Sequence, residues 1–292
     1  MTKVDREDQT VSDSVDSTSE CLISVIVATF NAGAFIQSCI SAFSDQEFQR
    51  KELVIVDGGS TDATVDLLSR NAKHVSHWIS EPDQGICDAW NKGVQIASGK
   101  WILFLGADDF LLSPNVLTEV ALHLEALPES CRVAYGKILT VSKRGDTLDQ
   151  WGRPWIDLKD SFRSMMTIPH QGVFHRKSLF DEVGGFDISL RFAGDYDLLL
   201  RAIELSPPQF MDGTVVTAMG VGGVSSRPTL SASVLQEFRI ARRNRGWPAV
   251  TLPWLWAYIK ARVKGVIAKA LGDDATVDLV RRLKGVSGDS RH

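Results

Sequence analysis

Short polar residues close each of three long apolar runs in this sequence. They are Thr29 and Asn31 (run 22–31), Asp57 (run 52–57), and Asp108 with Asp109 (run 100–109). Two adjacent carboxylates repel one another unless a cation or water lies between them. Mg²⁺ and Mn²⁺ bind through one or two carboxylates together with phosphate oxygens. The pattern therefore predicts a site for a nucleotide diphosphate and a divalent cation, provided that the three ends lie together.

The apolar runs and the segments between them predict an α/β domain. The runs are rich in β-branched residues, as in strands that are buried on both faces of a parallel sheet. Helical spacing of apolar residues separates them, which predicts a single Rossmann-like domain with a mostly parallel central sheet. Ligands bind such sheets at the carboxyl ends of the strands. The expected strands are 22–31, 52–57, 100–109 and 132–141, and the expected helices lie within 32–46, 58–70, 85–99 and 116–127.

The start of the second helix and the region after residue 142 give weaker patterns. Ser60 or Thr61 is the expected N-cap of that helix, with Asp62 in its first turn. After residue 142 the chain reads as loops, a helix at 195–205 and, within 209–226, a strand that ends in glycines. We expect residues 142–230 to extend the same domain and to cover one edge of the sheet.

Composition and charge divide the chain into three parts. The 292 residues carry a net charge of −4, and residues 1–20 hold six acids against two cations, which predicts a disordered acidic tail. We expect one domain at 21–230, with a nucleotide-binding half at 21–141 and an acceptor-side half at 142–230, followed by a helical tail at 231–292. The four cysteines form no C-x-x-C pair, and no signal peptide or run of about 18 apolar residues is present, which predicts a cytoplasmic protein.

The tail combines positive charge with an apolar stripe. Residues 239–271 carry eight basic side chains and no acid. Within 252–272, the apolar residues that fall within an arc of about 120° at helical spacing are Leu255, Trp256, Ile259, Val263, Val266, Ile267 and Ala270. A basic amphipathic helix with tryptophan fits an anionic membrane surface. The alternative is a helix packed on its own domain with a solvated basic edge, and no motif accompanies the charge that would predict nucleic-acid binding.

Common nucleotide motifs are absent. The sequence has no G-x-x-x-x-G-K-[ST], which argues against a P-loop ATPase. No G-x-G-x-x-G follows the first strand, and the late "GVGG" at 220–223 leads into "VSSRP", so a dinucleotide fold is not expected. The segment "DGGSTD" lacks the glutamate of a calcium loop, since Leu68 stands at its twelfth position.

Five blocks of the chain, taken in order, resemble family-two glycosyltransferases of the GT-A fold. The blocks are "ISVIVATFN", "ELVIVDGGSTDAT", "SEPDQGICDAWNKGVQIASGKWILFLGADD", "HQGVFHRKSLFDEVGGFD" and "AGDYDLLLR". They span residues 22 to about 225. The resemblance implies an inverting enzyme that moves a sugar from a nucleotide-sugar, with a UDP-sugar expected, to an acceptor hydroxyl with the help of Mg²⁺ or Mn²⁺.

On the donor side, the resemblance implies seven residues: Thr29, Phe30, Asn31, Asp57, Asp83, Asp88 and Asp109. The first three would line the base pocket, and Asp57 would accept a hydrogen bond from the base. Asp108 matches the metal-binding acid of the family's D-x-D, but Gly106 replaces the first acid, which puts a carboxylate contact to the ribose in doubt. Asp109 either assists the donor site or caps the next helix.

On the acceptor side, Asp195 aligns with the catalytic base of the family's E-D pair, while Gly194 replaces the glutamate. His170 and Gln171 fall in the acceptor-side stretch, although a structural role is the alternative for His170. The acceptor expected from the resemblance and the tail is a glycan or a lipid-linked molecule, in cell-surface polysaccharide or glycolipid synthesis. This places the protein in the cytoplasm, in contact with the inner membrane face.

Two other functions stay open. A sugar nucleotidyltransferase shares the α/β architecture, but its first loop holds a triphosphate with basic residues, and "FNAGAF" at 30–35 has none. A non-catalytic nucleotide-sugar-binding protein of the same fold would account for the departures at Gly106 and Gly194. Transfer or hydrolysis of a donor would distinguish this second alternative from an enzyme.

Overall fold

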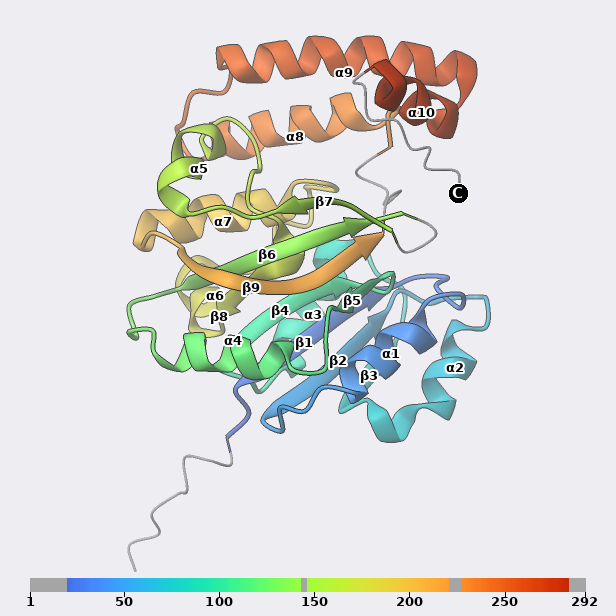
Figure 1. Ribbon diagram of the computed structural model, residues 1–292, viewed down its shortest axis with the longest axis vertical. Coiled ribbons are helices and arrows are strands. Elements are labelled where there is room, and N and C mark those ends of the chain that lie inside the picture. The colour runs from blue at the N-terminus through green and yellow to red at the C-terminus, as the bar shows by residue number, and fades with distance from the viewer. Residues whose placement is uncertain (1–19, 143–145, 221–226, 284–292) are drawn as a thin grey trace, which may run out of the picture.

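The computed structural model describes residues 20–142, 146–220 and 227–283, which form a nine-stranded sheet covered by helices (Figure 1). The predicted acidic tail, apart from Glu20, lies outside the described residues. The strand order is β3-β2-β1-β4-β8-β6-β9-β5, with β7 paired to β6. The first four strands are parallel to one another. These strands are β1 (Ile23–Thr29), β2 (Lys51–Asp57), β3 (His77–Ser80) and β4 (Trp101–Gly106).

Both faces of the parallel strands are buried, as the β-branched runs predict. Along β1, Val25 and Val27 face one apolar core while Ile26 faces the other, because side chains alternate across a sheet. The first core is covered by α1 (Ile36–Ser44), α2 (Thr64–Arg70) and α4 (Val116–Glu125). The second is covered by α3 (Ile86–Ile96), α6 (Ser178–Val183) and α7 (Gly194–Leu205).

The second half of the domain inserts strands into the sheet, which corrects the expectation that it only covers an edge. The short β8 (Val173–Arg176) pairs with β4 on one side and with β6 (Val133–Val141) on the other, antiparallel to both. Beyond β6 lie β9 (Gln209–Gly220) and β5 (Asp109–Leu111). The remaining elements of this half are β7 (Thr147–Trp151), α5 (Trp155–Phe162) and the short helix η2 (His170–Gly172).

One early strand is not predicted, and one predicted helix cap is wrong. β3 is not among the predicted strands, because "HWIS" at 77–80 is short and only half-buried. The second helix begins at Thr64, and neither Ser60 nor Thr61 caps it. Instead, Asp62 Oδ1 accepts a hydrogen bond from the backbone N–H of Thr64 (3.0 Å), because the two earlier hydroxyl residues belong to the turn after β2.

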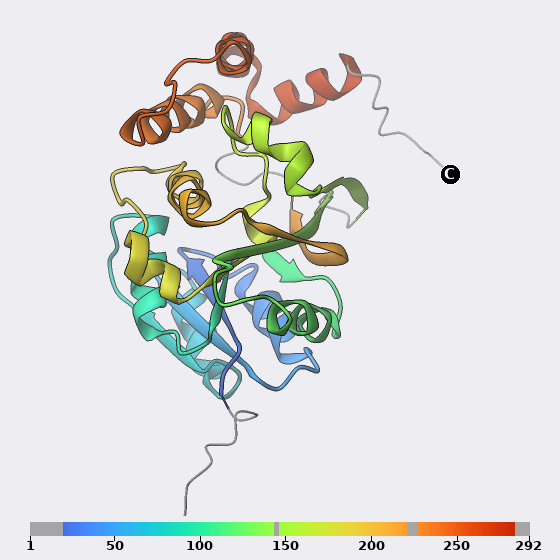
Figure 2. The same ribbon diagram turned by 90° about the vertical axis from the view of Figure 1, so that its left-hand side faces the viewer.

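Three helices form a layer at one end of the molecule. They are α8 (Ser231–Asn244), α9 (Leu252–Leu271) and α10 (Asp273–Leu283). α8 packs on α7, and α9 packs on α8 and α10, so that α9 is the outermost element of this end (Figures 1 and 2). No helix in the described part of the chain is long and apolar enough to cross a membrane.

Candidate functional site

The carboxyl ends of β1, β2 and β4 lie at one level on one edge of the sheet. Thr29 stands opposite Asp57 across the β1–β2 ladder, and Ala28 stands opposite Gly106 across the β1–β4 ladder. Adjacent strands are about 4.8 Å apart, so the ends of β2 and β4 lie about 10 Å from one another. The prediction that the three polar ends share one rim is confirmed by this register.

Asp57 is fully buried, and its carboxylate accepts hydrogen bonds from its own chain. Oδ2 accepts from the backbone N–H groups of Gly59 (3.2 Å) and Ser60 (2.8 Å) and from Ser80 Oγ (2.6 Å), and Oδ1 accepts from Ser60 Oγ. A carboxylate offers about four acceptor positions. Asp57 therefore fixes the turn after β2 to the end of β3. The predicted contact with a nucleotide base would require one of these bonds to be exchanged.

The turn after β1 presents an aromatic ring and is locked to the turn after β2. Phe30 is 63% exposed, whereas Thr29 is buried. Asn31 has a φ of 49°, in the left-handed region that asparagine tolerates better than most residues. Its backbone N–H donates to Ser60 Oγ (2.7 Å), and its Oδ1 accepts from the N–H of Thr61 (2.9 Å). Of the three residues predicted for a base pocket, Phe30 is the one with an open face on which a base could stack.

Asp83 and Asp88 organise the start of α3, next to the turn after β2. Asp83 Oδ1 accepts from the N–H of Gly85 (2.8 Å), and Asp88 Oδ2 accepts from the N–H of Gln84 (3.0 Å). Gly85 has a φ of 117°, which favours glycine at this position. A Cβ added to Gly58 would lie 2.5 Å from Asp83 Oδ2, so this carboxylate lies directly against the β2 turn. Asp83 thus borders the rim, and Asp88 holds the loop before α3 in place through its bond to Gln84.

The two acids after β4 have opposite surroundings. Asp108 is exposed, and its carboxylate has no hydrogen bond or ion pair within the described residues. Asp109 is 4% exposed, and its Oδ2 accepts from the N–H of Gly106 (2.9 Å). Burial raises the pKa of Asp109 to about 7. Because Asp109 begins β5, the helix-cap alternative is wrong, and its burial leaves Asp108 as the carboxylate of this turn that is open to a ligand.

Gly106, which departs from the D-x-D pattern, lies against the two acids that follow it. A Cβ at Gly106 would lie 2.9 Å from Asp108 Oδ1 and 3.3 Å from Asp109 Oδ2. A side chain at Gly106 would therefore require the exposed Asp108 to move and would lie close to the buried Asp109. Residues 20–142, 146–220 and 227–283 contain no group of three or more His, Cys, Asp or Glu that could hold a metal ion. A cation at this turn would take Asp108 and complete its shell with oxygens from a ligand.

Asp195 lies in the first turn of α7, which α8 holds in place. Glu237 Oε2 accepts from the N–H groups of Phe192 (2.6 Å) and Ala193 (3.0 Å), just before the helix. Asp195 Oδ1 accepts from the N–H of Tyr196 (2.7 Å). Burial raises the pKa of Asp195 to about 6; the hydrogen bond from Tyr196 opposes this rise and the charge of Glu237 adds to it. Such a carboxylate is ionised at neutral pH yet more basic than an ordinary aspartate, which suits a general base.

Cys87 occupies the space beside Gly194, where the family pattern has glutamate. A Cβ at Gly194 would lie 2.3 Å from Cys87 Sγ. The thiol donates to the carbonyl of Leu190 (3.3 Å), and burial raises its pKa to about 12, so it is neutral. Cys87 and Leu190 also line a pocket of about 350 Å³ between the start of α3 and the loop at 187–191. This pocket is therefore adjacent to the turn that carries Asp195.

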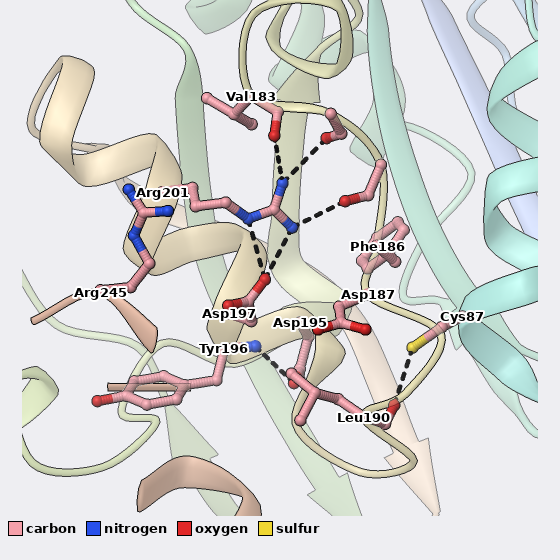
Figure 3. A network of polar contacts seen from close by, with 12 residues as sticks. Cys87, Val183, Phe186, Asp187, Leu190, Asp195, Tyr196, Asp197, Arg201 and Arg245 are labelled. Carbon is pink, nitrogen blue, oxygen red and sulfur yellow. Dashed lines mark hydrogen bonds and ion pairs between the residues drawn. The ribbon is translucent and has the colours of Figure 1, made fainter. Parts of the chain in front are cut away.

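Arg201 holds the loop that precedes this pocket (Figure 3). Its guanidinium pairs with Asp197 (2.9 Å) and donates to the carbonyls of Val183 (2.7 Å), Gly184 (3.1 Å) and Gly185 (2.8 Å). Both members of the ion pair are largely buried. The bonds join the middle of α7 to the loop at 183–185 and so fix the path of the chain towards Asp195.

His170 is buried, which corrects its assignment to the acceptor side. It is 6% exposed, its Nε2 lies 3.3 Å from His175 Nε2, and its ring stacks on Phe104 at a centroid distance of 5.7 Å. Burial lowers the pKa of His170 to about 3, so it stays neutral. Gln171 is half-buried, and its carbonyl accepts from Thr217 Oγ1 (3.0 Å). His170 is a core residue, in agreement with the structural alternative.

Three residues that shape the site are not among the predicted ones. Asp197 and Arg201 are four residues apart on a predicted helix, and this spacing predicts an ion pair, although not the bonds to loop carbonyls. Glu237 gives no such signal, because it lies more than 40 residues from Phe192 and Ala193, whose N–H groups it accepts, and only tertiary packing brings them together.

Comparison with known proteins gives a consistent result. Residues 24–182 match the family model described as "Glycosyl transferase family 2". The chain is 33% identical over 211 residues to a "PGL/p-HBAD biosynthesis glycosyltransferase" of Mycobacterium tuberculosis, covering 70% of this chain and 79% of the relative. It is 31% identical over 251 residues to another M. tuberculosis glycosyltransferase, named as uncharacterized, covering 84% and 92%.

Solved structures share the fold at low sequence identity. A mannosyltransferase from Pyrobaculum calidifontis in complex with GDP-Man and Mn²⁺ has a TM-score of 0.62 at 18% identity, covering 92% of this chain and 81% of the other. Residues 1–349 of S. aureus TarS in complex with UDP-GlcNAc have a TM-score of 0.59 at 17% identity, covering 76% and 67%. This chain spans 40% of a longer TarS chain. These neighbours establish the fold, which is the α/β GT-A architecture that the sequence predicts.

Proposed function

The chain belongs to glycosyl transferase family 2, and we propose that it transfers a sugar from a nucleotide-diphosphate sugar to an acceptor hydroxyl with inversion at the anomeric carbon. The observation that carries this proposal is the presence of two carboxylates in different surroundings. Asp108 is exposed and, among the described residues, unpaired at the strand-end rim, where we place a cation and a diphosphate. Asp195 has a raised pKa of about 6 at the start of α7, where a base is needed.

We propose that the donor is UDP-linked. The solved neighbours hold nucleotide-diphosphate sugars, UDP-GlcNAc in one case and GDP-Man in another. In our chain, Phe30 offers an exposed ring at the end of β1 for a base, while Asn31 and Asp57 hold the two flanking turns rigid. Asp83 closes the rim on the β3 side, and Asp88 keeps its loop in place.

The residues present fit a divalent cation, Mg²⁺ or Mn²⁺, at Asp108. This carboxylate is exposed, has no partner in the described part of the chain, and follows a strand whose neighbours end at the same level. When bound, the cation would neutralise the negative charge that grows on the leaving diphosphate. Asp109 contributes indirectly, because its bond to the N–H of Gly106 holds the turn from which Asp108 projects.

The acceptor hydroxyl would lose its proton to Asp195 as it attacks the anomeric carbon. Because Asp195 Oδ1 is engaged by the N–H of Tyr196, we assign Oδ2 as the atom that takes the proton. Inversion requires the base and the leaving diphosphate on opposite faces of the sugar. We place the sugar in the pocket lined by Cys87 and Leu190, because this pocket lies next to the turn of Asp195.

We propose a glycan or lipid-linked acceptor, in the synthesis of a cell-surface polysaccharide or glycolipid, and a cytoplasmic protein that contacts the inner membrane face. The support is the basic, apolar α9 and four cysteines that are all free thiols, with three of them buried. Gln171, at the acceptor-side stretch, is a weaker candidate for this side because only its carbonyl has a described contact.

Two measurements test the proposed function. Ligand-induced stabilisation should identify UDP, ahead of GDP and CDP, as the nucleotide that raises the melting temperature in the presence of Mn²⁺. Asp195→Asn should then reduce transfer by about 10²–10⁴-fold while leaving this stabilisation intact, because a general base contributes that much to the rate. Binding without any transfer or hydrolysis by the wild type would favour the non-catalytic alternative. Turnover of the Asn variant near the wild-type rate would remove Asp195 from the mechanism.

A further inference from the structure

The helix α9 turns one apolar face inwards and another outwards. Trp254, Ala261 and Ala268 follow one another at seven-residue spacing, are at most 6% exposed, and pack against the neighbouring helices. On the opposite side of the helix, six large apolar side chains are between 40% and 84% exposed. They are Leu252, Leu255, Trp256, Ile259, Val263 and Val266, which we name the outward face of α9. Folding of the domain thus leaves this face without a partner among the described residues.

The outward face belongs to a helix that is firmly docked. Trp254 Nε1 donates to the carbonyl of Leu235 (2.6 Å) in α8, and Thr251 Oγ1 bonds to Ser164 Oγ (3.0 Å) at the first turn. At the far end, the backbone N–H and the hydroxyl of Thr229 each donate to Asp273 (2.9 Å). Both ends of α9 are therefore tied to neighbouring elements, and the exposure of its apolar side chains is a property of the packed structure.

Positive charge borders the outward face. Residues 252–271 contain four cations, Lys260, Arg262, Lys264 and Lys269, and no acid. At 100° per residue, the exposed Arg262 and Lys269 fall along one edge of the apolar face and the exposed Lys260 falls along the other, whereas the half-buried Lys264 lies further round, towards the inward face. An apolar strip with cations along both edges is the pattern by which a helix lies in the interface of a membrane with anionic lipids.

Two of the basic residues predicted for the surface region at 239–271 pack within the protein instead. Arg242 is fully buried and donates to the carbonyls of Ser164, Pro248 (3.2 Å) and Ala249 (2.5 Å). Arg245 pairs with Glu204 at 2.6 Å. Arg242 and Arg245 thus hold the helical layer together, whereas Lys260, Arg262 and Lys269 of α9 are exposed beside its outward face.

We propose that the outward face of α9 docks on an anionic lipid bilayer, with its axis parallel to the surface and its bordering cations at the lipid phosphates. A second copy of this chain is a poorer occupant, because it would bring the same cations against each other. The segments outside the described residues are also poor candidates, because their only large apolar residues are Met1, Val4, Val11, Val15, Val221, Val224 and Val286. Anionic lipid supplies both the apolar volume and the opposite charge.

The docking surface connects to the candidate base through one intervening helix. α9 packs on α8, α8 packs on α7, and α7 carries Asp195 in its first turn. Packed helices have axes about 8–10 Å apart, so α7 lies within about 20 Å of α9. If the proposed transfer reaction holds, the base is thus within reach of a hydroxyl on a large lipid head group. The docking itself does not depend on that chemistry.

Co-sedimentation of the full chain with lipid vesicles, without donor or metal, tests the proposal. The wild type should bind vesicles that mix phosphatidylcholine with phosphatidylglycerol, and bind phosphatidylcholine alone much less. Val263→Asp places an acid in the middle of the face and should weaken binding at least about tenfold, since it removes an apolar group from the lipid and adds charge repulsion. Leu122→Asp is the matched control: Leu122 is 69% exposed on α4, at the opposite end of the molecule, and this variant should bind like the wild type.

A charge pair of variants completes the test. Lys269→Gln should weaken binding to the anionic vesicles about fivefold, because one Lys near such a surface contributes about 1 kcal/mol. Lys73→Gln, at an exposed lysine of the η1 turn (Ala72–His74), should have no effect. Unchanged melting temperatures would show that all four variants fold. The proposal is overturned if the wild type stays off the vesicles, if Val263→Asp binds as well as Leu122→Asp, or if Val263→Asp instead converts a dimer into a monomer.

Discussion

The raised pKa of Asp195 predicts a distinctive pH dependence of transfer. A base with a pKa of about 6 is about 90% ionised at pH 7 and about 10% ionised at pH 5, so the rate should fall about tenfold between these values. An aspartate with its ordinary pKa of 3.8 would stay ionised throughout this range and give a flat profile. The structural cause of the difference is mainly burial at the start of α7, with a contribution from the charge of Glu237.

The assay is a pH profile of kcat at saturating donor, acceptor and Mn²⁺, measured from pH 5 to 8. Glu237→Gln keeps an oxygen that can accept from the N–H groups of Phe192 and Ala193 but removes the charge, so the midpoint of the profile should move to lower pH. Asp109 also has a pKa in this range, and Asp109→Asn is the control that should leave the midpoint in place. A flat wild-type profile, or a midpoint that follows Asp109 instead of Glu237, would refute the assignment of Asp195 as the base.

Three further predictions concern stability. Burial raises the folded-state pKa of Asp109 from 3.8 to about 7, so protonated Asp109 favours folding, and this contribution is lost as the pH rises through 7. The gain in stability of Asp109→Asn over the wild type should therefore be larger at pH 8 than at pH 5, as measured by urea unfolding. Gly194→Ala should destabilise the fold through the 2.3 Å contact with Cys87 Sγ, and adding Cys87→Ala should recover about 1–2 kcal/mol in a double-mutant cycle; additive effects would disprove the clash. Arg201→Ala should cost about 3–5 kcal/mol because it leaves the buried Asp197 and three loop carbonyls without their partner, whereas a loss below about 1 kcal/mol would show that the pair behaves as an exposed one.

The parallel half of the sheet is predictable from the sequence because its signals are local. Strands buried on both faces leave continuous apolar runs, and parallel register brings their ends together, so the rim with Asp57 and Asp108 follows from the pattern. The short strands β3 and β5 lack such runs. β5 begins at Asp109 only because β9, more than 100 residues further along the chain, pairs with it.

The surroundings of the site residues depend on tertiary contacts and could not be predicted. Asp57 and Asp109 look like equals of Asp108 in the sequence, but the fold buries both and gives their oxygens backbone donors. The burial of His170 likewise depends on distant residues, since its ring packs against Trp90 of α3 and Phe104 of β4, both more than 60 residues earlier in the chain. Chemical type and spacing thus identify the candidates, while burial decides which of them can meet a ligand.

The proposed role of Asp108 is to share a divalent cation with the diphosphate of the donor. Calorimetric titration of UDP into the wild type, Asp108→Asn and Asp195→Asn, each with Mn²⁺ and with EDTA, measures this shared binding. The wild type and Asp195→Asn should bind UDP tightly only with Mn²⁺, and Asp108→Asn should bind weakly in both conditions. Equal affinity of the wild type with Mn²⁺ and with EDTA, or full Mn²⁺-dependent binding by Asp108→Asn, would contradict the claim.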